Sequence, residues 1–124
     1  MVKKEIQVLM SEAMEKYGKL ALATGNKEKM LSQGTETDSI QMPGISMLRL
    51  REAFLKLGDV LDEDENNKTI VAVVPTGAMQ ATRALSVARL DSDCVDIAVY
   101  CKEGLFKQHG AKRVIENLKK ELSR

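Results

Sequence analysis

The chain has very few aromatic residues: two Tyr, two Phe and no Trp, or 3% of its 124 residues. A surface that stacks the bases of single-stranded nucleic acid needs exposed rings, so the sequence argues against such a surface. The formal net charge is only +1, from 19 Lys and Arg against 18 Asp and Glu. So balanced a chain has no overall field to attract nucleic acid or an anionic membrane. We therefore expect no nucleic-acid partner, and, without an apolar run of about 18 residues, no membrane insertion.

Histidine and cysteine are equally scarce. His109 is the single histidine, and Cys94 and Cys101 are the two cysteines. Catalytic triads and histidine-based zinc sites need a partner arrangement that these residues cannot supply. In a strand, the odd separation of the two cysteines places their thiols on opposite faces and excludes a disulfide between them. The sequence thus predicts no catalytic residue, no metal site and no cofactor.

The start of the chain lacks the apolar segment of a secretory signal, which together with reduced thiols predicts a cytoplasmic protein. A length of 124 residues with 44% hydrophobic and 30% charged residues is typical of one globular domain. We expect that domain to span residues 1–124.

Three segments have the apolar spacing of amphipathic helices. The first stripe is Ile6, Leu9, Met10, Ala13, Met14 and Tyr17; the second is Met47, Leu50, Phe54, Leu57 and Leu61; the third is Ala111, Ile115, Leu118 and Leu122. Ser46 is placed to cap the second helix. Gly18 is placed to end the first.

Two β-branched runs, residues 69–74 and 94–101, predict strands. Residues 19–33 contain two short runs around Gly25-Asn26 and predict a β-hairpin. The polar segment 34–44, which ends in Pro-Gly, and the acidic segment 59–68 both predict loops.

Residues 76–91 are ambiguous. Their alanines and the spacing of Ala81, Leu85 and Ala88 favour a helix, which would join two parallel strands in a right-handed crossover. Read as a strand, residues 83–90 form the middle of an antiparallel meander. The first reading predicts an α/β fold with residues 78–90 as the crossover helix, and the second an α+β fold.

With the second reading, the order is helix, hairpin, helix, three strands, helix. This order resembles the roadblock/LC7 family of the profilin-like fold. Residues 20–32 are similar to the family's opening hairpin, and residues 95–107 with the helix 111–122 are similar to its last strand and closing helix. The alanine-rich region 76–93 departs from the family pattern, because it is longer than the usual pair of strands.

The resemblance implies a five-stranded antiparallel sheet with one helix on one face and two on the other. It also implies a non-enzymatic, dimeric module that scaffolds or regulates a protein partner, such as a small GTPase or a motor or cytoskeletal protein. The β-branched strand would then lie at the sheet edge, where unpaired backbone groups invite another chain. We expect a homodimer whose interface is formed by Thr69, Ile70, Val71, Val73, Leu48 and Leu55.

The alternative function is a nucleotide- or phosphate-binding α/β protein. Thr24, Asn26 and Lys29 resemble the T-x-N-x-x-K signature of the inosine/xanthosine triphosphate pyrophosphatases. Thr76 and Gly77 follow Pro75 after a strand, as phosphate loops do, although the lysine of a P-loop is missing. A turn with solvated lysines is the competing interpretation of the first motif.

Overall fold

A computed structural model describes residues 5–18, 35–75, 83–101 and 110–123. Within these ranges the elements are α1 (Ile6–Tyr17), β1 (Thr35–Gln41), α3 (Met47–Leu57), β2 (Asp59–Asp64), β3 (Thr69–Pro75), β4 (Arg83–Asp91), β5 (Cys94–Tyr100) and α4 (Gly110–Leu122). The strands form one sheet in the order β1-β5-β4-β3-β2, and every neighbouring pair is antiparallel. The predicted class, α+β with a helix-flanked antiparallel sheet, is confirmed.

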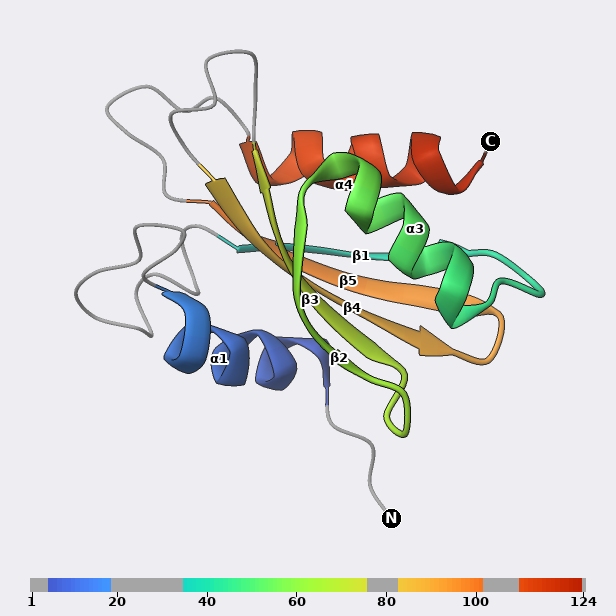
Figure 1. Ribbon diagram of the computed structural model, residues 1–124, viewed down its shortest axis with the longest axis horizontal. Coiled ribbons are helices and arrows are strands. Elements are labelled where there is room, and N and C mark those ends of the chain that lie inside the picture. Colours follow the sequence, from blue (N-terminus) through green and yellow to red (C-terminus); the bar gives the residue numbers. More distant parts are fainter. Residues whose placement is uncertain (1–4, 19–34, 76–82, 102–109, 124) are drawn as a thin grey trace.

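The helices lie on both faces of the sheet (Figure 1). α1 packs on β4 and β5 from one side, whereas α3 covers β2 and β3 and α4 covers β5 and β1 from the other. Side chains alternate between the faces along each strand, so Val95, Ile97 and Val99 join the α3/α4 core while Ala98 and Tyr100 join the α1 core. Among the described elements there is one helix on one face and two on the other, which is the layering that the resemblance implied.

The three predicted helices are present. In α1, the side chains of Met10, Ala13 and Met14 are buried against the sheet. α3 begins after Ser46, whose Oγ accepts a hydrogen bond from the Arg49 backbone N–H at 3.1 Å, as expected of an N-cap. All four members of the predicted α4 stripe are buried.

The ambiguous segment contains a strand. Residues 83–91 form β4, which is hydrogen-bonded to β3 and β5, so the crossover helix over 78–90 and the α/β alternative were wrong. Local propensity favoured a helix because of the alanines. In the sheet, Ala84 and Ala88 lie under the helices of one face while Leu85 and Val87 fill the other face, so tertiary packing overrides propensity.

Two predicted loops contain the edge strands. β1 lies within 34–44 and β2 within 59–68, and the second helix ends at Leu57 instead of continuing to Leu61. Leu61 belongs to β2, next to a β-bulge, and packs in the α1 core. Both strands were missed because edge strands can be polar: only Ile40 is buried in β1, and no residue of β2 is. The hairpin predicted over 19–33 lies outside the described residues.

The edge position predicted for residues 69–74 was wrong. β3 lies between β2 and β4 and forms backbone pairs with both. At Gly58, in the turn between α3 and β2, the backbone lies close to β3. A Cβ on Gly58 would be only 2.2 Å from the carbonyl oxygen of Val73. Only glycine allows this approach.

Candidate functional site

The structure separates the six predicted interface residues into two groups. Thr69, Ile70, Val71 and Val73 lie in the internal strand β3, and the side chains of Ile70 and Val73 are buried in the α3/α4 and α1 cores, respectively. Leu48 and Leu55, by contrast, are 56% and 55% exposed on α3. Of the six predicted residues, only these two leucines are large hydrophobic side chains exposed to solvent. The residues of the phosphate-site alternative (Thr24, Asn26, Lys29, Thr76 and Gly77) belong to ranges that the structure does not describe.

The exposed face of α3 carries a stripe of two leucines and two charged residues. Leu48, Arg51, Glu52 and Leu55 follow the i, i+3, i+4, i+7 spacing that brings side chains onto one helix face. The buried stripe with Leu50 and Phe54 faces the sheet. The outward stripe has an apolar residue at each end and two opposite charges in the middle. We call these four residues the α3 stripe.

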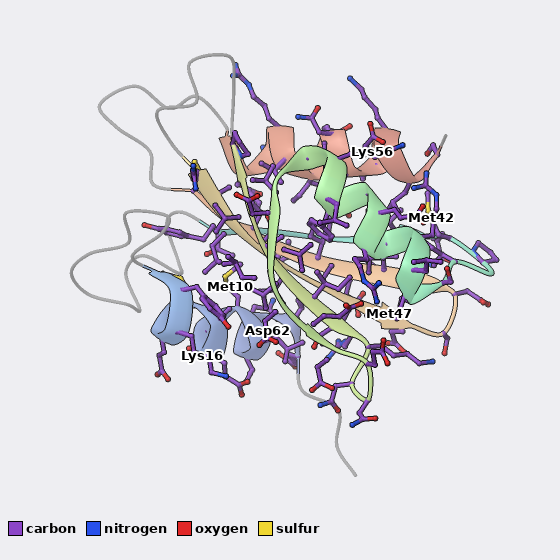
Figure 2. All side chains as sticks on the ribbon, viewed as in Figure 1. Met10, Lys16, Met42, Met47, Lys56 and Asp62 are labelled. Atoms are coloured by element: carbon purple, nitrogen blue, oxygen red, sulfur yellow. The ribbon has the colours of Figure 1, made fainter. Side chains whose placement is uncertain are left out.

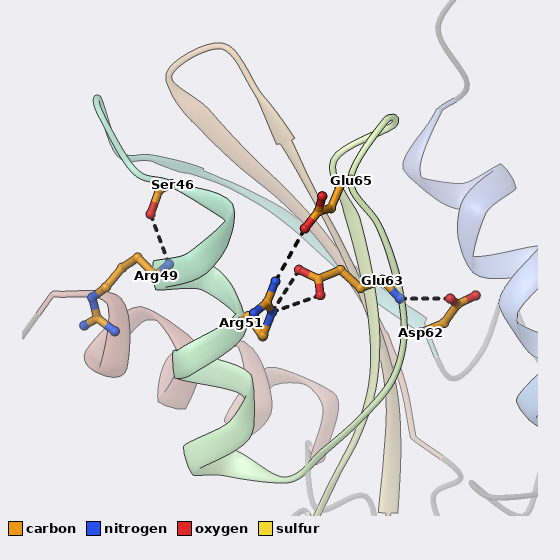
Figure 3. A network of polar contacts seen from close by, with 6 residues as sticks. All are labelled: Ser46, Arg49, Arg51, Asp62, Glu63 and Glu65. Carbon is orange, nitrogen blue, oxygen red and sulfur yellow. Dashed lines mark hydrogen bonds and ion pairs between the residues drawn. The ribbon is translucent and has the colours of Figure 1, made fainter.

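An ion-pair network attaches the α3 stripe to β2 (Figure 3). Arg51 Nε donates to both carboxylate oxygens of Glu63, at 3.0 and 2.9 Å, and Arg51 Nη2 lies 3.7 Å from Glu65 Oε1. The hydrogen bond that Arg51 donates to Glu63 raises the pKa of Arg51, so the guanidinium remains charged. The network fixes where this positive charge lies on the helix surface.

The outer edge of β2 is strongly acidic. Four of its residues carry carboxylates, namely Asp59, Asp62, Glu63 and Asp64. A bulge interrupts its register with β3 between Val60 and Asp62. Charges and bulges are the features with which proteins prevent one sheet edge from pairing with another.

A groove of about 730 Å³ lies on the opposite face of the sheet, between α1 and β2. Leu9 and Ala13 of α1 line one side, and Val71 and Val87 of the sheet lie at its floor. Figure 2 labels Lys16 on α1 and Asp62 on β2, which line the two walls. Sequence reasoning missed the groove, because it depends on which strands α1 leaves uncovered.

Polar side chains form a row across three strands that begins at Arg89, a residue of the groove lining. Arg89 Nη2 donates to Asp96 Oδ2 at 3.1 Å, and Ser39 Oγ donates to Asp96 Oδ1 at 3.0 Å. The three residues are register partners on β4, β5 and β1. The side chains of Arg89 and Asp96 are only 10% and 21% exposed. The Asp96 carboxylate therefore neutralises a guanidinium that is largely buried.

The structure does not assemble a metal or thiol site from these residues. Within the described ranges, no group of three or more His, Cys, Asp or Glu side chains is arranged to hold a metal ion. Cys94 and Cys101 are free cysteines. Cys94 accepts a hydrogen bond from Gln41 Nε2, while Cys101 is buried in the α3/α4 core, so their thiols lie on opposite faces as predicted.

Among the helices that the structure describes, none is long and apolar enough to cross a membrane. The chain matches no model of a known protein family and no curated protein. The resemblance to the roadblock/LC7 family therefore stays a prediction.

Proposed function

We propose that this protein is a non-enzymatic interaction module that pairs with a second copy of itself through the α3 stripe. The observation that supports this most directly is the order of side chains along the stripe. Leu48 and Leu55 are the most exposed large hydrophobic residues among those described, and they lie symmetrically about the Arg51–Glu52 pair.

This order is self-complementary. A two-fold axis that passes between Arg51 and Glu52 places two α3 helices antiparallel, with Leu48 of each copy opposite Leu55 of the other. The same axis brings Arg51 of each copy opposite Glu52 of the other. An isologous contact needs one patch that complements itself under a two-fold rotation, and the α3 stripe has that property in both its apolar and its charged positions.

The acidic strand β2 opposes the pairing of two copies through its edge of the sheet. If two β2 edges joined into a continuous antiparallel sheet, their four carboxylates per strand would face one another, which is unfavourable for like charges on paired strands. The bulge at Leu61 disturbs the regular row of backbone groups as well. The helix surface is therefore a better contact than the β2 edge, and β3, the strand expected from the sequence, is already paired on both sides.

The oligomeric state tests the proposal. Light scattering on the intact chain at micromolar concentration should give about twice the mass of the 13.7 kDa chain. The double variant Leu48→Asp, Leu55→Asp should give the monomer mass, because pairing through the α3 stripe would then bury carboxylates of the two copies against one another. Val8→Asp is the matched control, since Val8 is also an exposed hydrophobic residue, at 45%, but lies on α1; it should leave the dimer intact.

Charge reversal tests the geometry of the pairing. Arg51→Glu alone and Glu52→Arg alone each bring like charges together across the two-fold axis, so each variant should be mostly monomeric. Mixing the two variants should restore a dimer, because each charged position then meets its opposite in the other chain. A monomeric wild type, or a mixture that stays monomeric although both variants fold, would contradict the α3 pairing.

A regulatory or scaffolding role toward a small GTPase or a cytoskeletal or motor protein is the further part of the proposal. It is supported by the resemblance alone. Pull-down with the dimer and with the Leu48→Asp, Leu55→Asp variant, each against purified GTPases and actin, would test it. Binding that needs the dimer would support a scaffold, and absence of binding by both would remove these partners.

A further inference from the structure

The two edges of the sheet, β1 and β2, differ in how they are protected. β2 carries four carboxylates and a bulge, and both features oppose pairing with a further strand. β1 contains neither proline nor lysine, and its seven residues pair with β5 in one continuous register from Thr35 to Gln41. β1 is therefore the edge that presents a regular strand on its outer side.

Two hydrogen bonds show which backbone groups of β1 point away from β5. Met42 N–H donates to Asp93 O at 2.7 Å, so the even-numbered residues of β1 direct their backbone groups toward β5. Ser39 N–H instead donates to the carboxylate of the preceding residue, Asp38 Oδ1, at 2.8 Å. The odd-numbered residues, whose N–H and C=O groups point outward, are Thr35, Thr37, Ser39 and Gln41.

These outward groups form a row for strand pairing. Among the described residues, the N–H groups of Thr37 and Gln41 have no hydrogen-bond acceptor. Ser39 N–H is bound by the Asp38 side chain, which a partner carbonyl can replace. A row of unpaired N–H and C=O groups along a sheet edge is a template for another strand. The backbone of this edge therefore specifies an extended segment as its complement.

The side chains of β1 specify the chemistry of that segment. On the α3/α4 side, Asp38 is bound by Lys119 and Ile40 is buried in the core. Glu36, on the same side, is exposed and forms no ion pair with a described residue. The four outward-facing residues place uncharged polar side chains on the α1 side. A cation opposite Glu36, an aliphatic residue opposite Ile40 and hydroxyl residues on the other face would complement this pattern.

A second copy of the chain complements this edge less well. When two β1 strands overlap fully in antiparallel register, Asp38 of one copy faces Asp38 of the other, and Glu36 faces Ile40. Like charges directly opposite one another on paired strands are destabilising. The charge pattern therefore favours a different protein as the source of the strand.

We propose that the outer edge of β1 binds an extended segment of a partner protein as an additional antiparallel strand, with a basic residue opposite Glu36. In this mode the main-chain hydrogen bonds give affinity and the alternate side chains give specificity. α3 packs on β2 and β3, at the other end of the sheet (Figure 1), so a dimer formed through the α3 stripe leaves both β1 edges accessible. The inference does not depend on the proposed dimer.

The probe is a fluorescein-labelled peptide with the sequence Thr-Val-Thr-Val-Thr-Lys-Thr and blocked ends. In the antiparallel register its first Val faces Ile40 and its Lys faces Glu36. Its anisotropy should rise and saturate on titration with the full chain. The same peptide with Glu in place of Lys should bind roughly threefold more weakly, as expected for the loss of an exposed ion pair.

Two N-methylated peptides test whether the backbone is what binds. Methyl groups on the third and fifth nitrogens remove the N–H groups that face Ser39 and Thr37, and should weaken binding at least about tenfold. Methyl groups on the second and fourth nitrogens remove N–H groups that point away from β1. This matched peptide keeps the same side chains and the same number of methyl groups, and it should bind much more tightly than the first.

Substitutions in β1 make the same test from the protein side. Thr37→Pro removes an N–H that points outward, which an edge strand tolerates, and should weaken binding about fivefold. Thr37→Ala keeps that N–H and is the control. Glu36→Lys should weaken binding of the Lys peptide and strengthen binding of the Glu peptide. Asp62→Lys, the same kind of change on β2, should leave both affinities within about twofold.

Amide hydrogen exchange on the wild type locates the peptide without any substitution. In the free chain, the N–H groups of Thr37 and Gln41 should exchange much faster than that of Ile40, which faces β5. The peptide should protect the first two and change the third little. The Leu48→Asp, Leu55→Asp variant should bind the peptide like the wild type, which separates this result from the fate of the dimer.

Four outcomes would overturn the proposal. The first is slow exchange of Thr37 and Gln41 in the free chain, which would mean that the edge is already covered. The second is protection of these amides that increases with protein concentration alone, which would make a second copy the occupant. The others are equal binding of the two N-methylated peptides and no binding of the unmethylated peptide at millimolar concentration.

Discussion

The two faces of the sheet contain the same five strands but differ in how they are closed. Among the described residues, the α3/α4 core contains 19 buried residues and the α1 core contains eight. On β4, three of the four residues on the α3/α4 side are small, namely Ala84, Ser86 and Ala88 beside Leu90, whereas the α1 side carries Leu85, Val87 and Arg89. Small side chains let two helices settle close to one face. Larger ones, with two methionines from α1, fill the other face under a single helix.

The two faces of this one sheet therefore have different roles. The face with two helices is closed over its whole width and supplies most of the hydrophobic core. The face with one helix keeps part of its apolar floor at a groove. Four experiments with substitutions would break or sharpen this comparison.

The largest expected effect comes from removing one leucine on each face. Leu50 and Leu85 are both fully buried. We expect Leu50→Ala to lower the free energy of unfolding by about 4 kcal/mol and Leu85→Ala by about 3 kcal/mol. The loss is smaller on the α1 side because Met10 and Met14 have flexible side chains that can refill a cavity. Urea unfolding at matched protein concentration measures both; equal losses would show that the two cores are equally rigid.

Gly58→Ala should cost about 2 kcal/mol through overpacking. The new methyl group would lie 2.2 Å from Val73 O and 2.9 Å from Val74 Cα, which are backbone atoms, so α3 and β3 would have to move apart. Thermal and urea unfolding would report the loss. Gly44→Ala is the control for a glycine without a close neighbour: its Cβ would meet nothing within 4 Å, and only the strain of φ +80° opposes it. An unchanged stability for Gly58→Ala would mean that the helix is not held tightly on β3.

Ser86→Ala should raise the free energy of unfolding by up to about 1 kcal/mol. Ser86 is fully buried, and its Oγ has no hydrogen-bond partner among the described residues. Ser39→Ala on the other side of the sheet is the counterpart, because it removes the hydrogen bond to Asp96 and should lower stability by a similar amount. The same unfolding experiment should thus show opposite signs; a loss of stability in Ser86→Ala would reveal a role for this hydroxyl in the core.

The smallest expected effect is a pH-dependent one at the rim of the closed face. Lys119 Nζ lies 2.7 Å from Asp38 Oδ2, and this hydrogen bond lowers the pKa of Asp38 below its ordinary value of 3.8. A carboxyl group whose pKa falls on folding stabilises the protein fully above pH 3.8 and loses this contribution as the pH falls through the lowered value. Asp38→Asn should therefore be slightly less stable than the wild type at neutral pH, and the difference should vanish in acid. Because both groups are 37% exposed, the effect should also fall with added salt; a difference that does not shrink as the pH falls below 3.8 would contradict the assignment to this ion pair.

The helices were predictable because their signal is local. A stripe at the 3.6-residue period persists over three or more turns in each of them, and Ser46 marks the start of α3 in the sequence itself. The strands β3 and β5 were predictable for a similar reason, since β-branched runs such as Ile70 to Val74 identify buried strands.

The edge strands were not predictable from the same signals. β1 and β2 are polar, and they are strands because β5 and β3 supply their hydrogen-bond partners. The interface prediction failed in part for this reason: without β2, the strand at residues 69–74 becomes an edge. Leu48 and Leu55 are exposed because they lie off the buried stripe of their helix, and their place in an interface stays a prediction.

The sequence by itself determined the three helices, two of the central strands, the placement of the two thiols on opposite faces and the self-complementary order of the α3 stripe. All of these depend on spacing along the chain. Only the tertiary structure decided that 83–91 is a strand, that β3 is internal and that a groove lies between α1 and β2. Each of these depends on which segments meet across the sheet, and the free energy of burying Ala84 and Ala88 between two strands and under the helices outweighs the local preference of alanine for a helix.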